Sequence, residues 1–471
     1  MMYTHTFTLL ASLAVGASAG TLSVPFSKQK LHHEPSLHKR DTLTLTGLNN
    51  ITGGGYFGQF QIGTPGQNIS FHLDTGSSDT WVNSVDTDLC NSKTLQELTG
   101  PCQATFDPDK SSTYKLVDQD AFNITYLDTR RILGDYFNDT VTIDGKSIKK
   151  QQLGLAVKSA SSTGIMGLGF STGVAGNKTY PAIVENMMSQ GLIERAAFSL
   201  WLDDLHSEEG TVLFGGIDTE KFVGKLTTLP LAPILPGHNI TAFSVPLKGL
   251  GVTMPKGQDS VELDDFQNNT ITIVDSGATA CQMPDNQTEA IYKAFDVLSI
   301  RDVNVPFVDC AYAEGKGKGI TFDFKFDGKT IVVPMKEMVI NAFKDQQDVF
   351  KDPLVAPLFK GWEGVCMFGI SPISKYGISS GTLTLLGDTF LRSAYVVYDL
   401  TNEQLGIAGA NHRATKSSIV ELKKGDTKLP DVSGVEKAST SDDDEDNAAG
   451  QLSPASIVTL VMVAGAVLTF W

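Results

Sequence analysis

The sequence FHLDTG, at residues 71–76, returns in the second half of the chain as TIVDSG, at residues 272–277. Each copy is a largely apolar run that ends in an aspartate, and a hydroxyl residue and a glycine follow. Later in each half comes an apolar run that contains glycine, IMGLG at 165–169 and LLGD at 385–388. A duplication of this kind predicts two similar lobes, each presenting one aspartate on a glycine-containing turn.

The two aspartates of this repeat, Asp74 and Asp275, are the predicted catalytic pair. If the lobes face each other, two like charges meet at close range and cannot both ionise, so the pair holds one proton. The ionised member would take a proton from a water that attacks a peptide carbonyl, and the protonated member would donate to the carbonyl oxygen. This chemistry needs no cofactor and no metal, and the sequence contains neither a CxxC pair nor an HExxH motif to predict a zinc site.

The sequence allows two other functions besides that of an active endopeptidase. A binding or wall protein could keep the same fold without catalysis, but the presence of both aspartates favours the enzyme. A serine hydrolase is disfavoured because no Gly-x-Ser-x-Gly elbow has a plausible histidine partner. Nucleic acid is excluded as a partner because the formal net charge is −16, whereas phosphate binding needs a basic surface.

The region from residue 43 to about 411 is predicted to be mainly β. Short runs rich in β-branched and aromatic residues alternate with glycine, asparagine, aspartate and proline. Two alternating runs end in Asp-Gly, at 144–145 and 327–328, and each predicts a hairpin. Helical stretches are few, and the best candidates are 182–190 and 286–295.

The first forty residues predict targeting and processing. Residues 1–19 hold an apolar run with a small-residue cleavage site, which is typical of a signal peptide; a buried N-terminal strand is the alternative. Residues 20–40 are expected to be a basic pro-segment that a protease removes after its final Lys-Arg pair, although an ordinary charged loop is the alternative. We expect the remainder to divide into an N-terminal lobe at 41–230, a C-terminal lobe at 231–412 and a Ser/Thr/Asp-rich stalk at 413–450.

The end of the sequence predicts a lipid anchor. Residues 451–471 are expected to be a GPI-attachment signal that is removed, because small residues, a polar spacer and an apolar end follow one another. Asn447 is the expected attachment site. A transmembrane helix is the alternative, but the apolar run at 456–471 is shorter than the roughly 20 residues that span a bilayer. We therefore expect a secreted monomer, GPI-anchored at the outer face of the plasma membrane or in the cell wall.

Sequons and cysteines are typical of the same compartment. Of the five cysteines, one stays unpaired in an oxidising environment; we expect disulfides Cys90–Cys102 and Cys310–Cys366 and a free thiol at Cys281. Asn-x-Ser/Thr sequons predict glycosylation at eight positions: Asn50, Asn68, Asn123, Asn138, Asn177, Asn239, Asn268 and Asn286.

Residues 74–82, DTGSSDTWV, resemble the first active-site loop of the pepsin family of aspartic proteases. The resemblance extends from about residue 55 to residue 411, and with the predicted targeting segments the chain looks most like the fungal yapsin-type branch. It implies a bilobal fold with a central substrate cleft, a β-hairpin flap over that cleft, and peptide or protein substrates. It also implies a set of residues that support the catalytic pair: Thr75, Gly76, Ser77, Ser276, Gly277 and Ala278.

Within this set the resemblance implies specific hydrogen bonds. Thr75 and Ser276 would exchange hydrogen bonds between the lobes, and Ser77 would donate to Asp74. Ala278 departs from the pattern, because a hydroxyl residue often follows the second motif. Losing a donor disfavours the charged form of a carboxylate, so we expect a pH optimum less acidic than that of pepsin.

The resemblance also implies a flap. Tyr126 would lie at its tip and share a hydrogen bond with the indole of Trp81, although plain core packing is the alternative for both residues. Leu127 stands where the family usually has glycine. Asp128 sits where some fungal members carry an acid that meets a basic substrate side chain, which favours cleavage after Lys or Arg; an exposed ion pair with Arg130 is the alternative.

Overall fold

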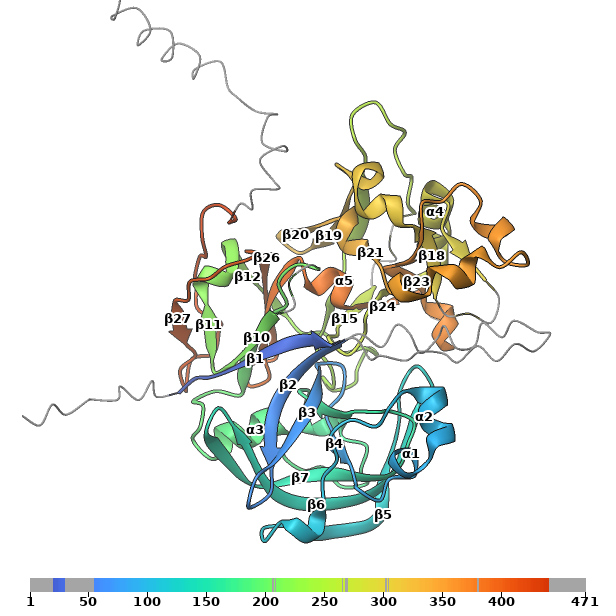
Figure 1. Cartoon of the computed structure of the whole chain (residues 1–471). Helices are drawn as coiled ribbons and strands as arrows, with labels where there is room; N and C mark the ends of the chain where they lie inside the picture. Colours follow the sequence, from blue (N-terminus) through green and yellow to red (C-terminus); the bar gives the residue numbers. More distant parts are fainter. Residues whose placement is uncertain are drawn as a thin grey trace, which may run out of the picture.

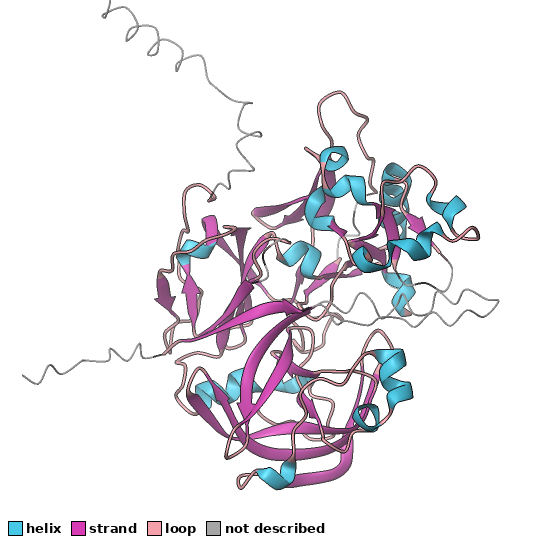
Figure 2. Cartoon of the chain, viewed as in Figure 1, coloured by secondary structure: helices cyan, strands magenta, loops and turns pink. Residues whose placement is uncertain are grey.

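The structure is a computed structural model that describes residues 20–29, 55–205, 207, 209–264, 266, 270–300, 303, 305–378 and 381–439. Within these ranges strands dominate and the helices are short (Figure 2), which confirms the predicted mainly β class. No helix in the described ranges has both the length and the apolar character needed to cross a bilayer. Four predicted features lie outside the described residues: the signal peptide, the Lys-Arg site, the GPI signal with Asn447, and the sequons at Asn50 and Asn268.

The largest sheet has thirteen strands and draws on both predicted lobes (Figure 1). The C-terminal strand β25 pairs with β9, and β26 pairs with β12, so the two halves share one sheet. The sequence did not predict this sharing. In sheet order the strands are β12 (Phe222–Pro230), β26 (Gln404–Ala410), β25 (Ala394–Asp399), β9 (Ala197–Trp201), β10 (Glu209–Phe214), β1 (Leu22–Gln29), β2 (Gly55–Ile62), β3 (Gln67–Asp74), β8 (Gly164–Gly167), β4 (Thr80–Asn83), β7 (Lys146–Ser159), β6 (Arg131–Ile143) and β5 (Lys115–Thr125).

The second half of the chain adds three smaller sheets, and α4 (Asp285–Phe295) packs against one of them (Figure 1). The five-stranded sheet runs β13 (Ser244–Pro246), β15 (Ile271–Val274), β24 (Leu383–Leu386), β16 (Cys281–Met283) and β23 (Ile370–Pro372). The other two contain β14 (Gly249–Thr253), β19 (Thr321–Phe326) and β20 (Lys329–Pro334), and β17 (Leu298–Ser299), β18 (Pro306–Asp309), β22 (Val365–Phe368) and β21 (Val339–Ile340).

The sequence repeat is also a structural repeat. In the first half β3 pairs in parallel with β8, and Asp74 lies opposite Gly167. In the second half β15 pairs in parallel with β24, and Val274 lies opposite Leu386. Each half therefore pairs its aspartate motif strand with the later apolar strand of the same half.

Local sequence signals gave the expected elements. The Asp-Gly turn at 144–145 joins β6 to β7, with φ of +46° and +71° at its two residues, and the turn at 327–328 joins β19 to β20. Helix α3 covers Ile183–Ser189, and α4 begins one residue before its predicted start. Both expected disulfides form: Cys90–Cys102 links α1 (Asp88–Asn91) to the chain after α2 (Lys93–Thr99), and Cys310–Cys366 closes a larger loop. Cys281 is a buried free thiol.

The described part of the predicted pro-segment is a sheet strand. β1 lies between β10 and β2 and pairs antiparallel with both, with Val24 opposite Val212 and Phe26 opposite Gly58. Its apolar side chains alternate with exposed ones and are buried. Residues 22–29 are thus part of the central sheet in this form of the chain.

Residues 413–439, which we call the C-terminal strap, differ from the predicted solvated stalk. The strap forms β27 (Ile419–Glu421) against β11 (Gly216–Asp218), and its own Leu422 and Leu429 are buried. Spaced apolar residues provide this packing, which the polar composition of the segment obscures. Any stalk therefore begins beyond the strap.

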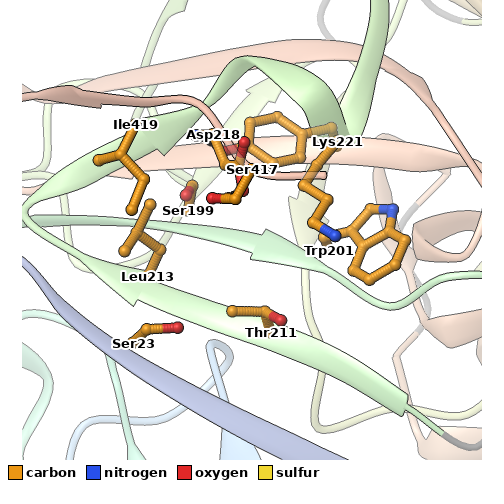
Figure 3. Close-up of a pocket in the computed structure, with 10 residues that line it drawn as sticks. Ser23, Ser199, Trp201, Thr211, Leu213, Asp218, Lys221, Ser417 and Ile419 are labelled. Carbon is orange, nitrogen blue, oxygen red and sulfur yellow. Dashed lines mark hydrogen bonds between the residues drawn. The ribbon is translucent and has the colours of Figure 1, made fainter. Parts of the chain in front are cut away.

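A small cavity of about 30 Å³ lies where the strap meets the sheet (Figure 3). Ser23 of β1 and Ile419 of the strap both line it, so the two ends of the described chain meet there. Ser417 donates to the carboxylate of Asp218, which fastens the strap beside the cavity. The volume accommodates one or two waters, and the cavity is distinct from the site of the two aspartates.

Candidate active site

The two active-site loops are joined by reciprocal hydrogen bonds. The Thr75 amide donates to Ser276 Oγ at 3.2 Å, and the Ser276 amide donates to Thr75 Oγ1 at 3.0 Å. Each hydroxyl then donates to a carbonyl of the opposite half, Thr75 to Val274 and Ser276 to Leu73, both at 2.9 Å. All four groups are buried, so these bonds fix the loops relative to each other, as the resemblance implies.

Two glycines allow the carboxyls to approach. A Cβ on Gly76 would lie 2.4 Å from the carboxyl of Asp275, and a Cβ on Gly277 would lie 2.3 Å from the carboxyl of Asp74. Both distances are far below a normal contact, so any larger residue would displace the opposite carboxyl. The glycines of the two motifs are thus required by this crossed packing.

Backbone amides and one hydroxyl orient the carboxyls. The Gly76 amide donates to Asp74 Oδ1 at 2.8 Å, and the Gly277 amide donates to Asp275 Oδ1 at 2.7 Å. Ser77 Oγ donates to Asp74 Oδ2 at 2.5 Å. The equivalent position in the second loop is Ala278, which has no hydroxyl to offer.

Burial and charge set the protonation of the pair. The carboxyls of Asp74 and Asp275 lie within electrostatic range of each other, and their residues are 5% and 8% exposed. Burial first, and then the negative charge of Asp74, hold the pKa of Asp275 well above its usual range. The pair therefore keeps one proton in the range where an isolated aspartate has lost its own.

A hairpin formed by β5 and β6 carries Tyr126 and Asp128 at its tip, and Trp81 lies on β4. The Trp81 indole donates to the hydroxyl of Tyr126 at 2.7 Å, and burial raises the pKa of Tyr126 well above its usual range. At the hairpin tip, Asp128 pairs with Arg130, and each side chain is 38% exposed. The structure therefore contains the ion pair that was the alternative for Asp128, and Leu127 is exposed beside it.

Sequence reasoning missed His72. It lies two residues before Asp74 on β3, so both side chains leave the same face of the strand. Its ring stacks on Phe57 with centroids 5.2 Å apart, and its Nε2 is buried without a hydrogen-bond partner. Burial lowers the pKa of His72 to about 4, against the opposing effect of the Asp74 charge. The strand alternation around the motif was the signal that could have found it.

The geometry defines a class of protein. Two aspartates from duplicated loops meet at the junction of two halves of a mainly β fold, and this is the arrangement that aspartic proteases have. Residues 55–410 match the model of a protein family that is described as "Eukaryotic aspartyl protease". The chain belongs to this family, the pepsin family, and it is an aspartic-type endopeptidase.

Fungal relatives agree with this assignment. The chain is 36% identical over 397 residues to a "Probable aspartic-type endopeptidase OPSB" of Arthroderma benhamiae. This alignment covers 82% of this chain and 74% of the relative. It is 33% identical over 393 residues to the opsB protein of Aspergillus oryzae, with 82% and 74% covered. It is 28% identical over 427 residues to "Aspartic proteinase yapsin-3" of Saccharomyces cerevisiae, with 85% and 75% covered.

The absence of a hydroxyl at Ala278 has a measurable consequence. In Ala278→Thr the new hydroxyl would donate to ionised Asp275, lower its raised pKa, and move the basic limb of the kcat/KM profile to lower pH. A hydrogen bond to a charged group contributes about 1.5–3 kcal/mol, which corresponds to a shift of about one to two pH units. Ala278→Val, which has the same shape without the hydroxyl, is the control. An unmoved limb in Ala278→Thr, or an equal shift in Ala278→Val, would contradict the explanation.

Proposed function

We propose that this enzyme is a secreted, cell-surface aspartic endopeptidase that hydrolyses peptide bonds by general acid–base activation of water between Asp74 and Asp275. The crossed approach of the two carboxyls, each lying over the glycine of the other loop, is the observation that carries this mechanism. The ionised carboxyl takes a proton from the water as it attacks, and the protonated carboxyl donates to the carbonyl oxygen. The carboxyl that took the water's proton then donates it to the amide nitrogen as the C–N bond breaks, and the other carboxylate takes a proton from a hydroxyl of the tetrahedral intermediate, so that the pair again holds one proton.

The β5–β6 hairpin is proposed as the flap that closes over a central substrate cleft. Tyr126 supports this role because its hydroxyl accepts from Trp81, which follows the Asp74 motif on the same loop and strand. The Asp74 charge also contributes to the raised pKa of Tyr126, so the two groups lie within electrostatic range. A flap at this place would exclude water from the bound peptide and order it over the pair.

Asp128 is proposed to favour substrates with Lys or Arg before the scissile bond. The carboxylate is at the hairpin tip and is partly exposed, so a basic side chain of a peptide could compete with Arg130 for it. This competition limits the effect, because exposed ion pairs contribute only about 0–1 kcal/mol. The expected preference is therefore modest.

We predict that Asp128→Ala lowers the ratio of cleavage after Lys or Arg to cleavage after Leu by about fivefold, which corresponds to the upper end of an exposed ion pair. The ratio is measured with a peptide library at fixed pH. Asp118→Ala, at an exposed position of β5 away from the tip, is the matched control and should leave the ratio unchanged. Unchanged selectivity in Asp128→Ala would remove the carboxylate from the specificity argument.

The proposed location rests on the targeting pattern of the sequence. A signal peptide at 1–19, processing after Arg40, a GPI lipid at Asn447 and loss of residues 451–471 would place the monomer on the outer face of the plasma membrane or in the cell wall. The exposed sequons of the described chain are compatible with glycosylation on that route: Asn68, Asn123, Asn177, Asn239 and Asn286, with Asn138 half-buried. Phosphatidylinositol-specific phospholipase C should release the enzyme from membranes, and deletion of residues 451–471 should release it to the medium. Retention in both experiments would contradict the anchor.

A further inference from the structure

Asp79 is a fully buried carboxylate that the catalytic mechanism does not use. It lies five residues after Asp74, on the loop that leads into β4. Its Oδ1 accepts from the hydroxyls of Tyr136 at 3.0 Å and Tyr180 at 2.6 Å, and its Oδ2 accepts from the amide of Ala175 at 2.6 Å. One side chain thus joins the active-site loop to β6 and to the segment before α3.

No cation in the described chain pairs with this carboxylate. The titratable groups that face it are Tyr136 from β6 and Tyr180 from the loop before α3, and Tyr126 of the hairpin lies within its electrostatic range. Arg130 and Asp74 act on Tyr126 but are not among the groups that shift Asp79. Burial raises the pKa of Asp79, and its three hydrogen bonds oppose that rise without abolishing it.

The segments that Asp79 joins are those that support the hairpin. β6 is the strand that leaves the hairpin tip, and Trp81, two residues after Asp79, donates to Tyr126. Val174, next to Ala175, packs against the same aromatic cluster as Tyr126. The buried members of that cluster include both tyrosines that bond Asp79. The carboxylate therefore connects three independent supports of the hairpin tip.

We propose that Asp79 is a positioning residue for the hairpin, holding the frame in which Tyr126 meets the substrate. This inference rests on the proposed role of the hairpin as a flap. An ionised Asp79 accepts all three hydrogen bonds at once. A protonated Asp79 must donate its own hydrogen, so one tyrosine becomes an acceptor and loses the partner of its own hydroxyl hydrogen. The frame is therefore tightest when Asp79 is charged.

The pH dependence of Asp79→Asn tests the inference. We expect kcat/KM of the wild type to exceed that of Asp79→Asn about tenfold near pH 7, and the ratio to approach one near pH 3, where the wild-type carboxyl is also neutral. A residue that only stabilised the fold would lower kcat/KM by a factor independent of pH. Asp139→Asn is the matched control: Asp139 is also buried and accepts from Ser111 and Thr113, but it lies at the far end of β6, so its ratio should not vary with pH.

A second variant keeps the test decisive if Asp79→Asn fails to fold. Tyr180→Phe removes one donor that lowers the pKa of Asp79, so the pKa of Asp79 should be higher in this variant than in the wild type. The ratio of wild-type to variant kcat/KM should therefore be largest between those two pKa values. A pH-independent ratio in Asp79→Asn, or in Tyr180→Phe if Asp79→Asn does not fold, overturns the inference. Tyr126→Ala separates the two proposals: unchanged kcat/KM in that variant defeats the flap role and the inference together. Lowered kcat/KM in Tyr126→Ala with a pH-independent ratio in Asp79→Asn defeats only the inference.

Discussion

Asp275→Asn is expected to lower kcat/KM toward a peptide substrate by about 10⁴-fold, because general acid–base catalysis by a positioned group contributes about 10²–10⁴. The amide has nearly the shape of the carboxyl, so the cross-loop hydrogen bonds of Thr75 and Ser276 should persist. It cannot hold or accept the catalytic proton. Asp74→Asn should have an effect of similar size, because the two carboxyls act as one unit.

Asp275→Asn should lower activity but raise the thermal stability of the protein at neutral pH. The pKa of Asp275 is raised in the folded protein, so its contribution to stability is present at acid pH and is lost as pH rises from the unfolded value toward the folded one. An asparagine does not ionise, so the variant does not lose stability in this way as the pH rises. The thermal midpoint of Asp275→Asn should therefore equal that of the wild type near pH 3 and exceed it near pH 7.

The measurement is a protease assay across pH with and without pepstatin, together with thermal unfolding of the same samples. Asp118→Asn, an exposed substitution on β5, should behave as the wild type in both experiments. Peptide hydrolysis at the wild-type rate by folded Asp275→Asn would refute the assignment of the pair. Lost activity with lost folding would instead point to a structural role.

Glu337→Gln is expected to destabilise the protein by about 3–5 kcal/mol, the usual cost of leaving one partner of a buried ion pair alone. Arg392 donates from Nε to Glu337 Oε2 at 2.6 Å and from Nη2 to the Glu337 carbonyl at 2.5 Å, and both side chains are at most 1% exposed. The Leu205 amide donates to the other carboxylate oxygen at 3.3 Å. A neutral amide would leave the buried guanidinium without its paired carboxylate. Arg392 directly follows α5 (Asp388–Leu391), and α5 begins at the residue that follows the glycine in LLGD. Loss of the Glu337–Arg392 ion pair would therefore destabilise the region next to the second active-site loop.

Urea unfolding of the purified enzyme measures this change. The double variant Glu337→Leu/Arg392→Met should recover much of the stability, because apolar replacements of a buried pair are often neutral or favourable. Asp348→Asn, which breaks the exposed pair with Lys351, should leave the midpoint unchanged. A Glu337→Gln midpoint equal to that of the wild type would mean that the pair contributes no net stability.

Local signals in the sequence were sufficient for much of the fold and of the site. The repeated Asp-Thr/Ser-Gly motif located both aspartates, and the structure brings them together. Hairpins followed from Asp-Gly turns, because few residues adopt the positive φ that such turns need. The hydrogen bond between Trp81 and Tyr126 came from resemblance alone, since its partners lie 45 residues apart.

Features built from long-range contacts escaped prediction. The pairing of β25 with β9 joins residues about 200 positions apart, and no pattern within either strand encodes its partner. The Asp79 cluster combines side chains from three segments that each look like ordinary core or turn sequence. Asp128 was ambiguous because one exposed acid beside an arginine can serve either substrate or neighbour.

The C-terminal strap sets the length of the proposed tether. Its last described residue, Ser439, donates its amide to Asn411 on the protein body, so Asn447 is only eight positions beyond that fixed point. Eight extended residues reach about 28 Å, whereas the 34 from residue 413 would reach about 120 Å. A tether this short would restrict the enzyme to a thin layer above the membrane surface. Its effective concentration would then be high for neighbouring membrane proteins and low for solutes that pass farther out.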